Sequence, residues 1–408
     1  MIVENIFEKK KRSKLSRARI LFLVIGYLII FGLIFSSGFI LGKNSALPLS
    51  NIISQSIGGD EASADFSVFR EAWKKLHDQY IGSISDQDLV YGAIRGMVEA
   101  AGDPYTAFFS PNENQRFKDD ISGEFDGIGV EITASDGVPT VVSPISDSPA
   151  EKAGIKAKDI IAEVDGTKTS EIGLDETINR IRGEAGTTVT LKIIREGSAD
   201  PLEIKVVRAK ISVASVSYDV KTSNGKKIGY LKIRQFGDDT EKLVSEAADK
   251  FNDEKAAGII VDLRNNPGGY LETSVEVASH FIDGGVIVSE IEKSGEKREF
   301  KTSGTANLKD QKLILLVNEG SASASEIVAG AVKDRDRGTL IGKKTYGKGS
   351  VQILENLSDG SGIKITIAKW YTPNGSQIDG VGIEPDMTVE GNEATDADEV
   401  LDFAMGQF

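Results

Sequence analysis

The chain has 408 residues, of which 40% are apolar and 27% are charged, with a formal net charge of −14 and no cysteine. This composition is typical of a globular protein with several hydrophobic cores, and it excludes collagen-like, disordered and disulfide-stapled classes. Because the balance of charge is acidic, we expect no nucleic-acid partner.

Residues 1–19 form a basic arm with seven Lys or Arg side chains against Glu4 and Glu8, a net charge of +5. Residues 20–42 then contain no charged side chain. As a helix this segment would extend over roughly 34 Å, enough to cross a hydrocarbon layer of about 30 Å. A cleaved signal peptide is the alternative, although its apolar region usually has only about 7 to 15 residues.

Positively charged flanks of a membrane span stay in the cytoplasm. We therefore expect a single-pass protein of the cell membrane, with a cytoplasmic arm over 1–19, a transmembrane helix over 20–42 and the later domains outside the cytoplasm. Residues 43–63 are mostly small or polar without sustained periodicity, which predicts a linker.

Residues 64–118 are expected to form a small helical module. Apolar side chains recur at three- and four-residue steps, which predicts one amphipathic helix; they are Phe66, Phe69, Trp73, Leu76 and Tyr80. A second helix should follow Asp86 and end near Gly102. His77 lies beside the first apolar face, and we interpret it as structural.

From about Asp119 to residue 211 the pattern predicts short strands separated by two helical stretches, and thus a compact strand-rich domain. Residues 212–390 then alternate strands with helices, which predicts a mixed α/β core. Its most apolar runs, 258–263 and 313–317, are typical of strands buried on both faces. Residues 391–408 are expected to be a C-terminal tail.

A serine-rich turn, from Ser321 to Ser325, lies between the apolar run 313–317 and a predicted helix that includes residues 326–332. A serine at a helix N-terminus is suited to nucleophilic catalysis, because free amides and the positive helix end favour an oxyanion. Three serines are candidates, and an ordinary helix cap would have the same sequence. The chain has no cysteine and only His77 and His280, both interpreted as structural, so a lysine is the remaining base.

Lys348 lies between Gly347 and Gly349, an unusual setting for a solvated charge. As a base it must be neutral, which requires its pKa to fall by about three from about 10.4. Burial against apolar walls lowers a lysine pKa in this way. Gln352 would neighbour Lys348 on a helix, but on a regular strand the two would be about 13 Å apart, so a strand would need a bend.

A phosphate loop is the competing interpretation of this segment. Residues 342–348 fit the spacing G-x-x-x-x-G-K after an apolar run. However, Gly349 occupies the position where a magnesium-ligating Ser or Thr is required. We therefore expect neither a nucleotide nor any other cofactor, and no metal site.

The strand-rich domain resembles PDZ domains of bacterial proteases, through residues 127–130, the stretch 148–155, Asp159-Ile160-Ile161 and Asp165-Gly166. The resemblance implies that backbone amides in the loop of Gly127, Ile128, Gly129 and Val130 bind the terminal carboxylate of a peptide, which then adds as a strand. The expected partners are proteins with apolar C-terminal tails.

Residues 66–389 resemble the carboxyl-terminal processing, or tail-specific, serine proteases. The resemblance rests on the serine-rich turn and Gly347-Lys348-Gly349, together with the segments 102–106, 262–269, 372–375 and 382–386. It implies that Ser323 is the nucleophile, Lys348 the general base and Gln352 its positioning partner. It also implies an oxyanion hole made by the amides of Gly269 and Ala324.

The expected architecture is therefore a multidomain, mixed α and β protein with a membrane anchor, a helical module, a PDZ-like domain over 119–211 and a serine protease core over 212–390. The alternative function is a PDZ adaptor with an inactive core. Arg182, at the end of a predicted helix, either couples tail binding to catalysis or only compensates the helix end. The resemblance implies a homodimer or higher oligomer through 64–118, whose apolar face could equally close onto its own chain.

Overall fold

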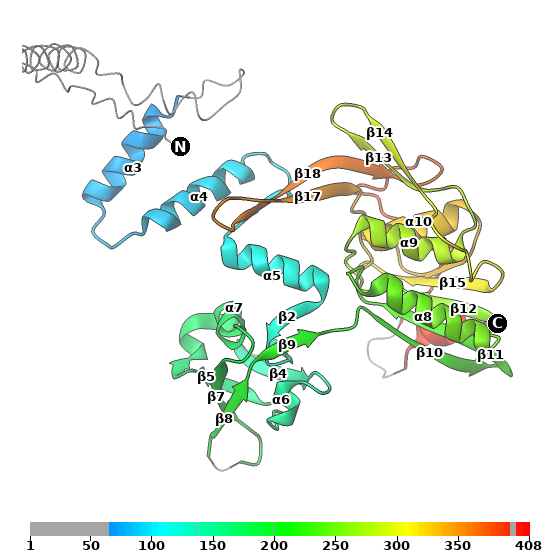
Figure 1. The fold of residues 1–408 in the computed structure, drawn as a ribbon, viewed down its shortest axis with the longest axis horizontal. Helices are drawn as coiled ribbons and strands as arrows, with labels where there is room; N and C mark the ends of the chain where they lie inside the picture. Colours follow the sequence, from blue (N-terminus) through cyan, green and yellow to red (C-terminus); the bar gives the residue numbers. More distant parts are fainter. Residues whose placement is uncertain (1–64, 136, 199, 392–396) are drawn as a thin grey trace, which may run out of the picture. The chain divides into compact units, whose positions relative to one another are not determined.

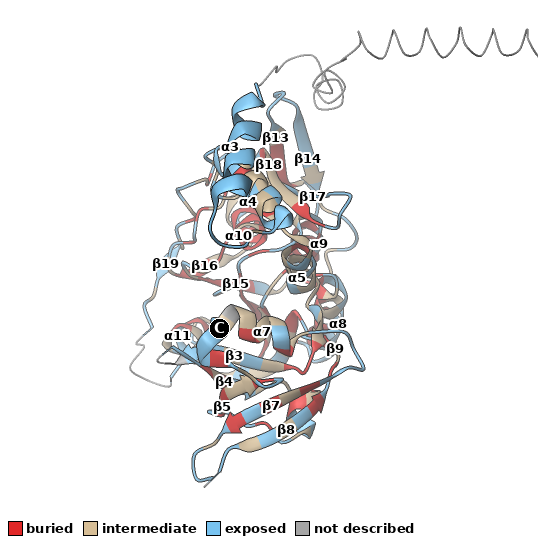
Figure 2. Ribbon diagram, turned by 90° about the vertical axis from the view of Figure 1, so that its left-hand side faces the viewer, coloured by how far each residue is buried: buried red, intermediate tan, exposed pale blue. Residues whose placement is uncertain are grey.

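The computed structural model describes residues 65–408 except 136, 199 and 392–396. The chain divides into two units, the first ending at Ser85 and the second beginning at Asp86. Helix α3 (Ser67–Gln79) belongs to the first unit and confirms the predicted amphipathic helix. It has no buried residue, and Figure 2 shows most of it in the colour of exposed residues. The expected membrane span lies outside the described residues, within which no helix has the length and hydropathy to cross a membrane.

The second unit begins with α4 (Asp86–Glu99), β1 (Ala107–Phe109) and α5 (Pro111–Ser122) (Figure 1). The sequence predicts a helical module over residues 64–118. In the structure β1 pairs with β18 (Gly362–Tyr371), so that this segment is part of the protease sheet. A strand of three residues is too short to produce a periodic pattern, which is why the sequence did not reveal it.

The strand-rich domain lies between β2 (Glu124–Gly127) and β9 (Ala209–Ser212), which pair antiparallel with each other. Its main sheet has the order β3 (Val130–Ser135), β4 (Val138–Pro144), β5 (Ile160–Val164), β7 (Thr188–Ile194) and β8 (Leu202–Val207), with the short β6 (Thr167–Lys168) beside β5. Helices α6 (Pro149–Lys152) and α7 (Thr169–Ile181) complete it. Its core contains alternate residues of the strands, including Val189, Leu191 and Ile193.

A six-stranded sheet forms the centre of the protease core. Its order is β10 (Val216–Ser223), β11 (Lys226–Ile233), β12 (Gly258–Asp262), β15 (Lys312–Val317), β16 (Thr339–Gly342) and β19 (Met387–Thr388). All neighbours from β11 to β19 are parallel, whereas β10 is antiparallel to β11. Three helices that belong to this core are α8 (Thr240–Asp253), α9 (Leu271–Phe281) and α10 (Ala324–Asp334).

A second sheet joins β1 to the core. Its order is β1, β18, β13 (Val286–Glu292) and β14 (Lys297–Lys301), and β17 (Ser350–Asn356) also pairs with β18. Strand β17 follows directly after the Lys348 segment. The residues of β1 pair with the first residues of β18, which brings the turn just before β1 next to the protease core.

The central strands are apolar throughout because both faces of the sheet are covered. Ile259, Val261 and Leu315 belong to the large core that includes α8, α9 and α10, whereas Ile260 and Ile314 face a separate cluster. The second cluster is completed by α11 (Glu399–Met405), with Val400 and Ala404 buried. Residues 391–408, expected to be a tail, thus contribute a helix that covers part of the sheet.

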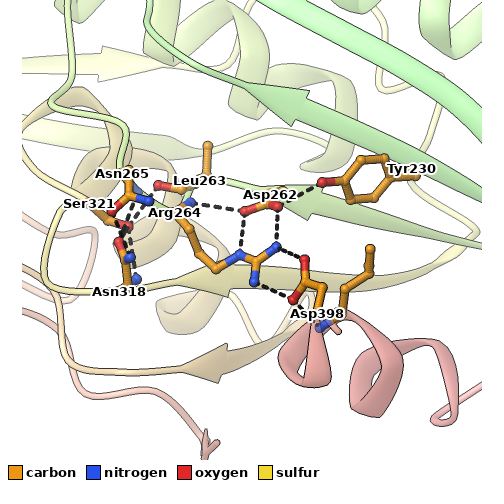
Figure 3. A network of polar contacts seen from close by, with 9 residues as sticks. Tyr230, Asp262, Leu263, Arg264, Asn265, Asn318, Ser321 and Asp398 are labelled. Carbon is orange, nitrogen blue, oxygen red and sulfur yellow. Dashed lines mark hydrogen bonds and ion pairs between the residues drawn. The ribbon is translucent and has the colours of Figure 1, made fainter. Parts of the chain in front are cut away.

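Helix α11 is joined to the end of β12 through Arg264, as Figure 3 shows. The two carboxylate oxygens of Asp398 accept from Arg264 at 2.7 Å each, and Asp398 also caps the helix by accepting from the Leu401 amide. The same guanidinium donates to Asp262, which is fully buried and also accepts from Tyr230 at 2.8 Å. Because a buried carboxylate needs a charged or hydrogen-bonding partner, Arg264 compensates Asp262.

Replacing Asp398 by alanine should loosen α11. Loss of an N-cap costs about 1 kcal/mol, which corresponds to roughly fivefold faster exchange of the helix amides with solvent deuterium. Hydrogen exchange followed by mass spectrometry measures this effect. Asp398→Asn is the matched control because asparagine also caps helices, so it should exchange more slowly than the alanine variant. Equal exchange in the wild type and Asp398→Ala would contradict the role of this cap.

Candidate active site

Three consecutive parallel strands direct their carboxyl ends to one edge of the central sheet. The loop after β12 contains residues 263–270, the turn after β15 contains residues 318–323, and the loop after β16 contains residues 343–349. Ligand and catalytic sites in open α/β sheets lie at this edge. The glycine-rich loop, the serine-rich turn and Lys348 are therefore neighbours, although 85 residues separate Lys348 from Leu263.

Ser323 is the residue at the start of α10 and has φ +54° and ψ −116°. A side chain other than glycine in this region costs on the order of 1–3 kcal/mol and persists only where neighbouring contacts enforce it. The turn thus presents Ser323 in a strained conformation at the positive end of a helix. This is the position that the sequence predicted for a nucleophile.

The structure distinguishes the three serines of the turn. Ser321 and Ser325 are fully buried, and their hydroxyls donate to the carbonyl oxygens of Leu263 and Asn266, at 2.8 and 2.9 Å. Both therefore hold the loop after β12 against the turn. Ser323 is only partly buried and its hydroxyl donates to neither carbonyl.

The glycine-rich loop lies directly against Ser323. A methyl group built on Gly268 would lie 2.7 Å from the Ser323 Cβ and 3.0 Å from the Ala324 amide nitrogen, so only glycine fits there. Gly269 lies in the next position with φ +142° and forms a parallel bridge with Phe236. Among the described residues, neither the Gly269 amide nor the Ala324 amide donates to a protein acceptor, which leaves both available to an oxyanion.

Lys348 is partly buried, and its flanking glycines allow the close approach of residues 379–382. Gly347 has φ +92°, and a methyl group on Gly349 would lie 2.6 Å from the Asp379 amide nitrogen. Burial of the amine is the main cause that lowers the pKa of Lys348, and the nearby Lys364 lowers it further, against Glu326 and Asp103. The direction is the one that a general base requires.

The carboxylate of Glu326 joins the segments of Ser323 and Lys348. One oxygen accepts from the backbone amides of Ser323 and Lys348, both at 2.9 Å. The other accepts from the Gly347 amide at 2.7 Å and from the Thr345 hydroxyl at 2.6 Å. Glu326 is fully buried, and burial raises its pKa in spite of these four bonds. The sequence analysis missed this role, although the spacing Ser-x-x-Glu at a helix start is that of a capping box.

Gln352 lies on β17, where its amide donates to the hydroxyls of Ser350 at 2.9 Å and Thr366 at 3.2 Å. Among the described contacts it has no bond to Lys348, and Lys348 Nζ has none to the Ser323 hydroxyl. The backbone thus holds the segments of Ser323 and Lys348 together, while the two side chains form no described bond with each other. The predicted orienting role of Gln352 stays a prediction.

The predicted peptide-binding loop joins β2 to β3. Gly129 has φ +74° and fits closely against Ser148, while the side chain of Ile128 is buried in the domain core, so that only its backbone could face a ligand. Strand β3 lies at the end of its sheet, with no partner on its outer side among the described strands. Such an edge accepts an added strand.

Arg182 lies at the end of α7, next to this loop. Its guanidinium lies 4.8 Å from the centre of the Phe125 ring and forms an ion pair of 3.1 Å with Asp120 of α5. Its other terminal nitrogen, Nη1, is buried without a hydrogen-bond partner in the described part of the chain. Arg182 therefore connects the strand-rich domain with α5, and it has an unused donor.

Two alternative chemistries of the sequence analysis receive no support from this geometry. The residue after Gly347-Lys348-Gly349 begins a strand, β17, whereas a phosphate loop leads into a helix. His280 is nearly buried on α9, and its Nδ1 lies 2.8 Å from the side-chain oxygen of Asn307. It is a structural histidine, as predicted.

Replacing Glu326 by glutamine should loosen the contact between the two segments. The amide group of glutamine keeps one oxygen, so that buried donors lose an acceptor at a cost of about 2 kcal/mol, or roughly 30-fold faster exchange of the Gly347 and Lys348 amides. Hydrogen exchange measures this effect. Glu319→Gln is the matched control, since Glu319 is an exposed glutamate of the same turn that pairs with Lys343. The proposed link is refuted if Glu326→Gln exchanges these amides at the wild-type rate.

Comparison with protein families gives three matches along the chain. Residues 227–389 match the model of peptidase family S41, residues 127–206 match a PDZ domain, and residues 29–112 match the N-terminal domain of the activating protease CtpB. The first two confirm the expected protease core and PDZ domain. The third extends over residues that the sequence analysis divided among a membrane span, a linker and a helical module.

Curated relatives agree with these matches. A carboxy-terminal-processing protease of Bartonella bacilliformis is 40% identical over 328 residues, which are 79% of this chain and 74% of that protein. A probable CtpA-like serine protease of Staphylococcus haemolyticus is 42% identical over 320 residues, or 78% of this chain. The chain spans only 63% of the length of that second relative.

Solved structures show the same fold. The photosystem II D1 C-terminal processing protease matches with a TM-score of 0.51 and 29% identity, over 83% of this chain and 91% of that one. A putative S41 protease of Bacteroides fragilis matches with a TM-score of 0.54 and 15% identity, over 85% and 98%, which is a likeness of fold alone. With the family models and the relatives, these findings show that this chain belongs to the carboxy-terminal-processing proteases of peptidase family S41.

Proposed function

We propose that this protein is a membrane-anchored serine endopeptidase that recognises the C-terminal tails of proteins through its PDZ domain and cleaves peptide bonds with Ser323 and Lys348. The observation that carries the proposal is the strained, partly exposed Ser323 next to the amides of Gly269 and Ala324, which have no acceptor in the described part of the chain. The uncharged segment 20–42 after a basic arm supports the anchor, with the protease domains outside the cytoplasm.

In the first step, neutral Lys348 takes the proton of the Ser323 hydroxyl while the oxygen attacks the carbonyl carbon of the substrate. The amides of Gly269 and Ala324 would stabilise the negative oxygen of the tetrahedral intermediate. The Lys348 ammonium then gives its proton to the leaving amine, and water hydrolyses the acyl-enzyme. Ser323 and Lys348 must approach each other for this step, since catalytic hydrogen bonds often form only when substrate is bound.

Substrate tails are expected to pair with the free edge of β3 and to place their carboxylate at the loop of residues 127–130. Apolar tails suit this site because β-strand addition buries alternate side chains of the peptide. A second candidate function, a PDZ adaptor with an inactive core, would need the same edge strand. The lowered pKa of Lys348 favours the enzyme, because a shift in this direction helps a general base and serves no purpose in an adaptor.

The proposal predicts that the full chain, purified in detergent, cleaves a partly unfolded protein with an apolar C-terminus. Ser323→Ala and Lys348→Ala should each lower kcat by about 10³-fold or more. Lys344→Ala is the matched control, because Lys344 is an exposed lysine of the same loop that pairs with Glu384. Activity should fall as the pH falls through the pKa of Lys348, since the protonated amine cannot accept a proton. A chelator should have no effect. If both dyad variants cleaved like the wild type, the assignment would be wrong.

Arg182 is proposed to couple tail binding to catalysis, and its ion pair with Asp120 supports this role. Cleavage of a substrate without a tail, measured with and without an added apolar tail peptide, reports the coupling. Arg182→Ala should reduce the stimulation by the peptide about fivefold or more, the usual size of such couplings. Arg180→Ala, which removes an exposed neighbour paired with Glu176, should leave it intact. If stimulation by the peptide were unchanged in Arg182→Ala, Arg182 would have no coupling role and would only compensate the charge at the end of its helix.

A further inference from the structure

The amine of Lys348 faces an aromatic ring from a distant part of the chain. Its Nζ lies over the ring of Tyr105, 5.3 Å from the ring centre. No described hydrogen bond or ion pair engages this nitrogen. Tyr105 precedes Lys348 by 243 residues and comes from the turn between α4 and β1. The immediate environment of the amine is therefore an aromatic face from a segment outside the protease core that the sequence analysis defined.

Hydrogen bonds within the turn and to β18 hold the segment that carries Tyr105. The carboxylate of Asp103 accepts from the Tyr105 amide at 3.2 Å and from the Thr106 hydroxyl at 2.5 Å. The Thr106 hydroxyl in turn accepts from the Thr366 amide of β18 at 3.1 Å. The Thr366 hydroxyl also accepts a hydrogen bond from the side-chain amide of Gln352. Hydrogen bonds thus connect Gln352 with the turn whose Tyr105 ring lies over Lys348. The sequence predicted a direct contact between Gln352 and Lys348 instead.

An aromatic ring has two effects on an amine that lies on its face. The apolar ring excludes water, which favours the neutral amine, and its electron-rich face attracts an ammonium ion once that ion forms. The first effect suits Lys348 before proton transfer and the second suits it afterwards. The hydroxyl of Tyr105 is near Tyr346, and burial raises the pKa of Tyr105, which keeps this side chain neutral.

Charged groups also act on Lys348 from the neighbouring elements. Lys364 of β18 disfavours the ammonium, whereas Glu326 of α10 and Asp103 of the turn favour it. Asp379 and Tyr346 lie near the hydroxyl of Tyr105. Glu326 is occupied by four donors, and Asp103 by the turn that it stabilises. The ring of Tyr105 lies over the amine itself.

We propose that Tyr105 is a positioning residue of the active site, whose ring holds the Lys348 amine and stabilises the ammonium that forms when Lys348 takes the proton of Ser323. The O–H bond of Ser323 breaks and an N–H bond of Lys348 forms, with the positive charge over the ring. When the ammonium gives that proton to the leaving amine, the neutral pair returns. This inference rests on the function proposed above.

The test compares three substitutions of Tyr105 in the full chain through the pH dependence of kcat and kcat/KM. Tyr105→Phe keeps the ring and should stay within about twofold of the wild type. Tyr105→Leu keeps the apolar cover without the aromatic face, so kcat should fall about 3- to 30-fold. The acid limb of the pH profile, where activity falls as Lys348 is protonated, should move to lower pH because the ammonium loses the ring that stabilises it. Tyr105→Ala admits water, so its acid limb should move to higher pH. KM should change little in all three.

Tyr91→Leu is the matched control for a general loss of packing. The ring of Tyr91 packs against Phe108 of β1 and its hydroxyl donates to Asp359, so this variant disturbs the same region without touching Lys348. Its acid limb should stay at the wild-type pH. The proposal is overturned if Tyr105→Leu has the kcat and the acid limb of Tyr105→Phe, or if Tyr105→Phe is as impaired as Tyr105→Leu.

A measurement independent of turnover separates this inference from the proposed function. The pKa of Lys348 is measured by competitive acylation and mass spectrometry in the Ser323→Ala background, where it should fall in Tyr105→Leu and rise in Tyr105→Ala. If these shifts occur but the chain with Ser323 intact cleaves no substrate, the contact is real and the proposed function fails. If the dyad variants are inactive but the pKa of Lys348 does not change with Tyr105, the function stands and the role of Tyr105 fails.

Discussion

The rest of the site depends on the hydrogen bonds that the buried carboxylate of Glu326 accepts. It binds the backbone amides of Ser323, Gly347 and Lys348, and so holds a strained turn and a glycine-flanked loop at a constant separation. An ionised carboxylate is expensive to bury, and four donors compensate that cost. The arrangement fixes the backbone and leaves the side chains of Ser323 and Lys348 free to meet, as the proposed mechanism requires.

The parallel sheet explains why such distant segments meet. Adjacent parallel strands end at the same edge, so the loops after β12, β15 and β16 bring Gly269, Ser323 and Lys348 to one place. Segments from the two ends of the second unit then complete the surroundings. The turn before β1 places the ring of Tyr105 over Lys348, and α11 fixes Arg264 at the start of the glycine-rich loop.

Much of this could be predicted from the sequence, for identifiable reasons. The central strands are apolar without interruption because helices cover both faces, and a serine between such a strand and a helix indicates an exposed turn. The excluded chemistries also follow from residue types, since the chain lacks cysteine and both histidines lie on helices. By contrast, β1 is too short for a periodic pattern, and α11 was expected to be part of a tail because its seven residues show little pattern of their own.

The sequence by itself determined the types of domain and the pair of residue types available for catalysis, because hydrophobic periodicity and side-chain chemistry are local properties. Only the tertiary structure decided which serine is accessible. The hydroxyls of Ser321 and Ser325 are buried and donate hydrogen bonds to a loop more than 50 residues away in the sequence. It also decided what surrounds Lys348. The pKa of an amine depends on burial and on neighbouring charges and rings, and these come from Glu326, Lys364 and Tyr105, which no spacing in the sequence connects.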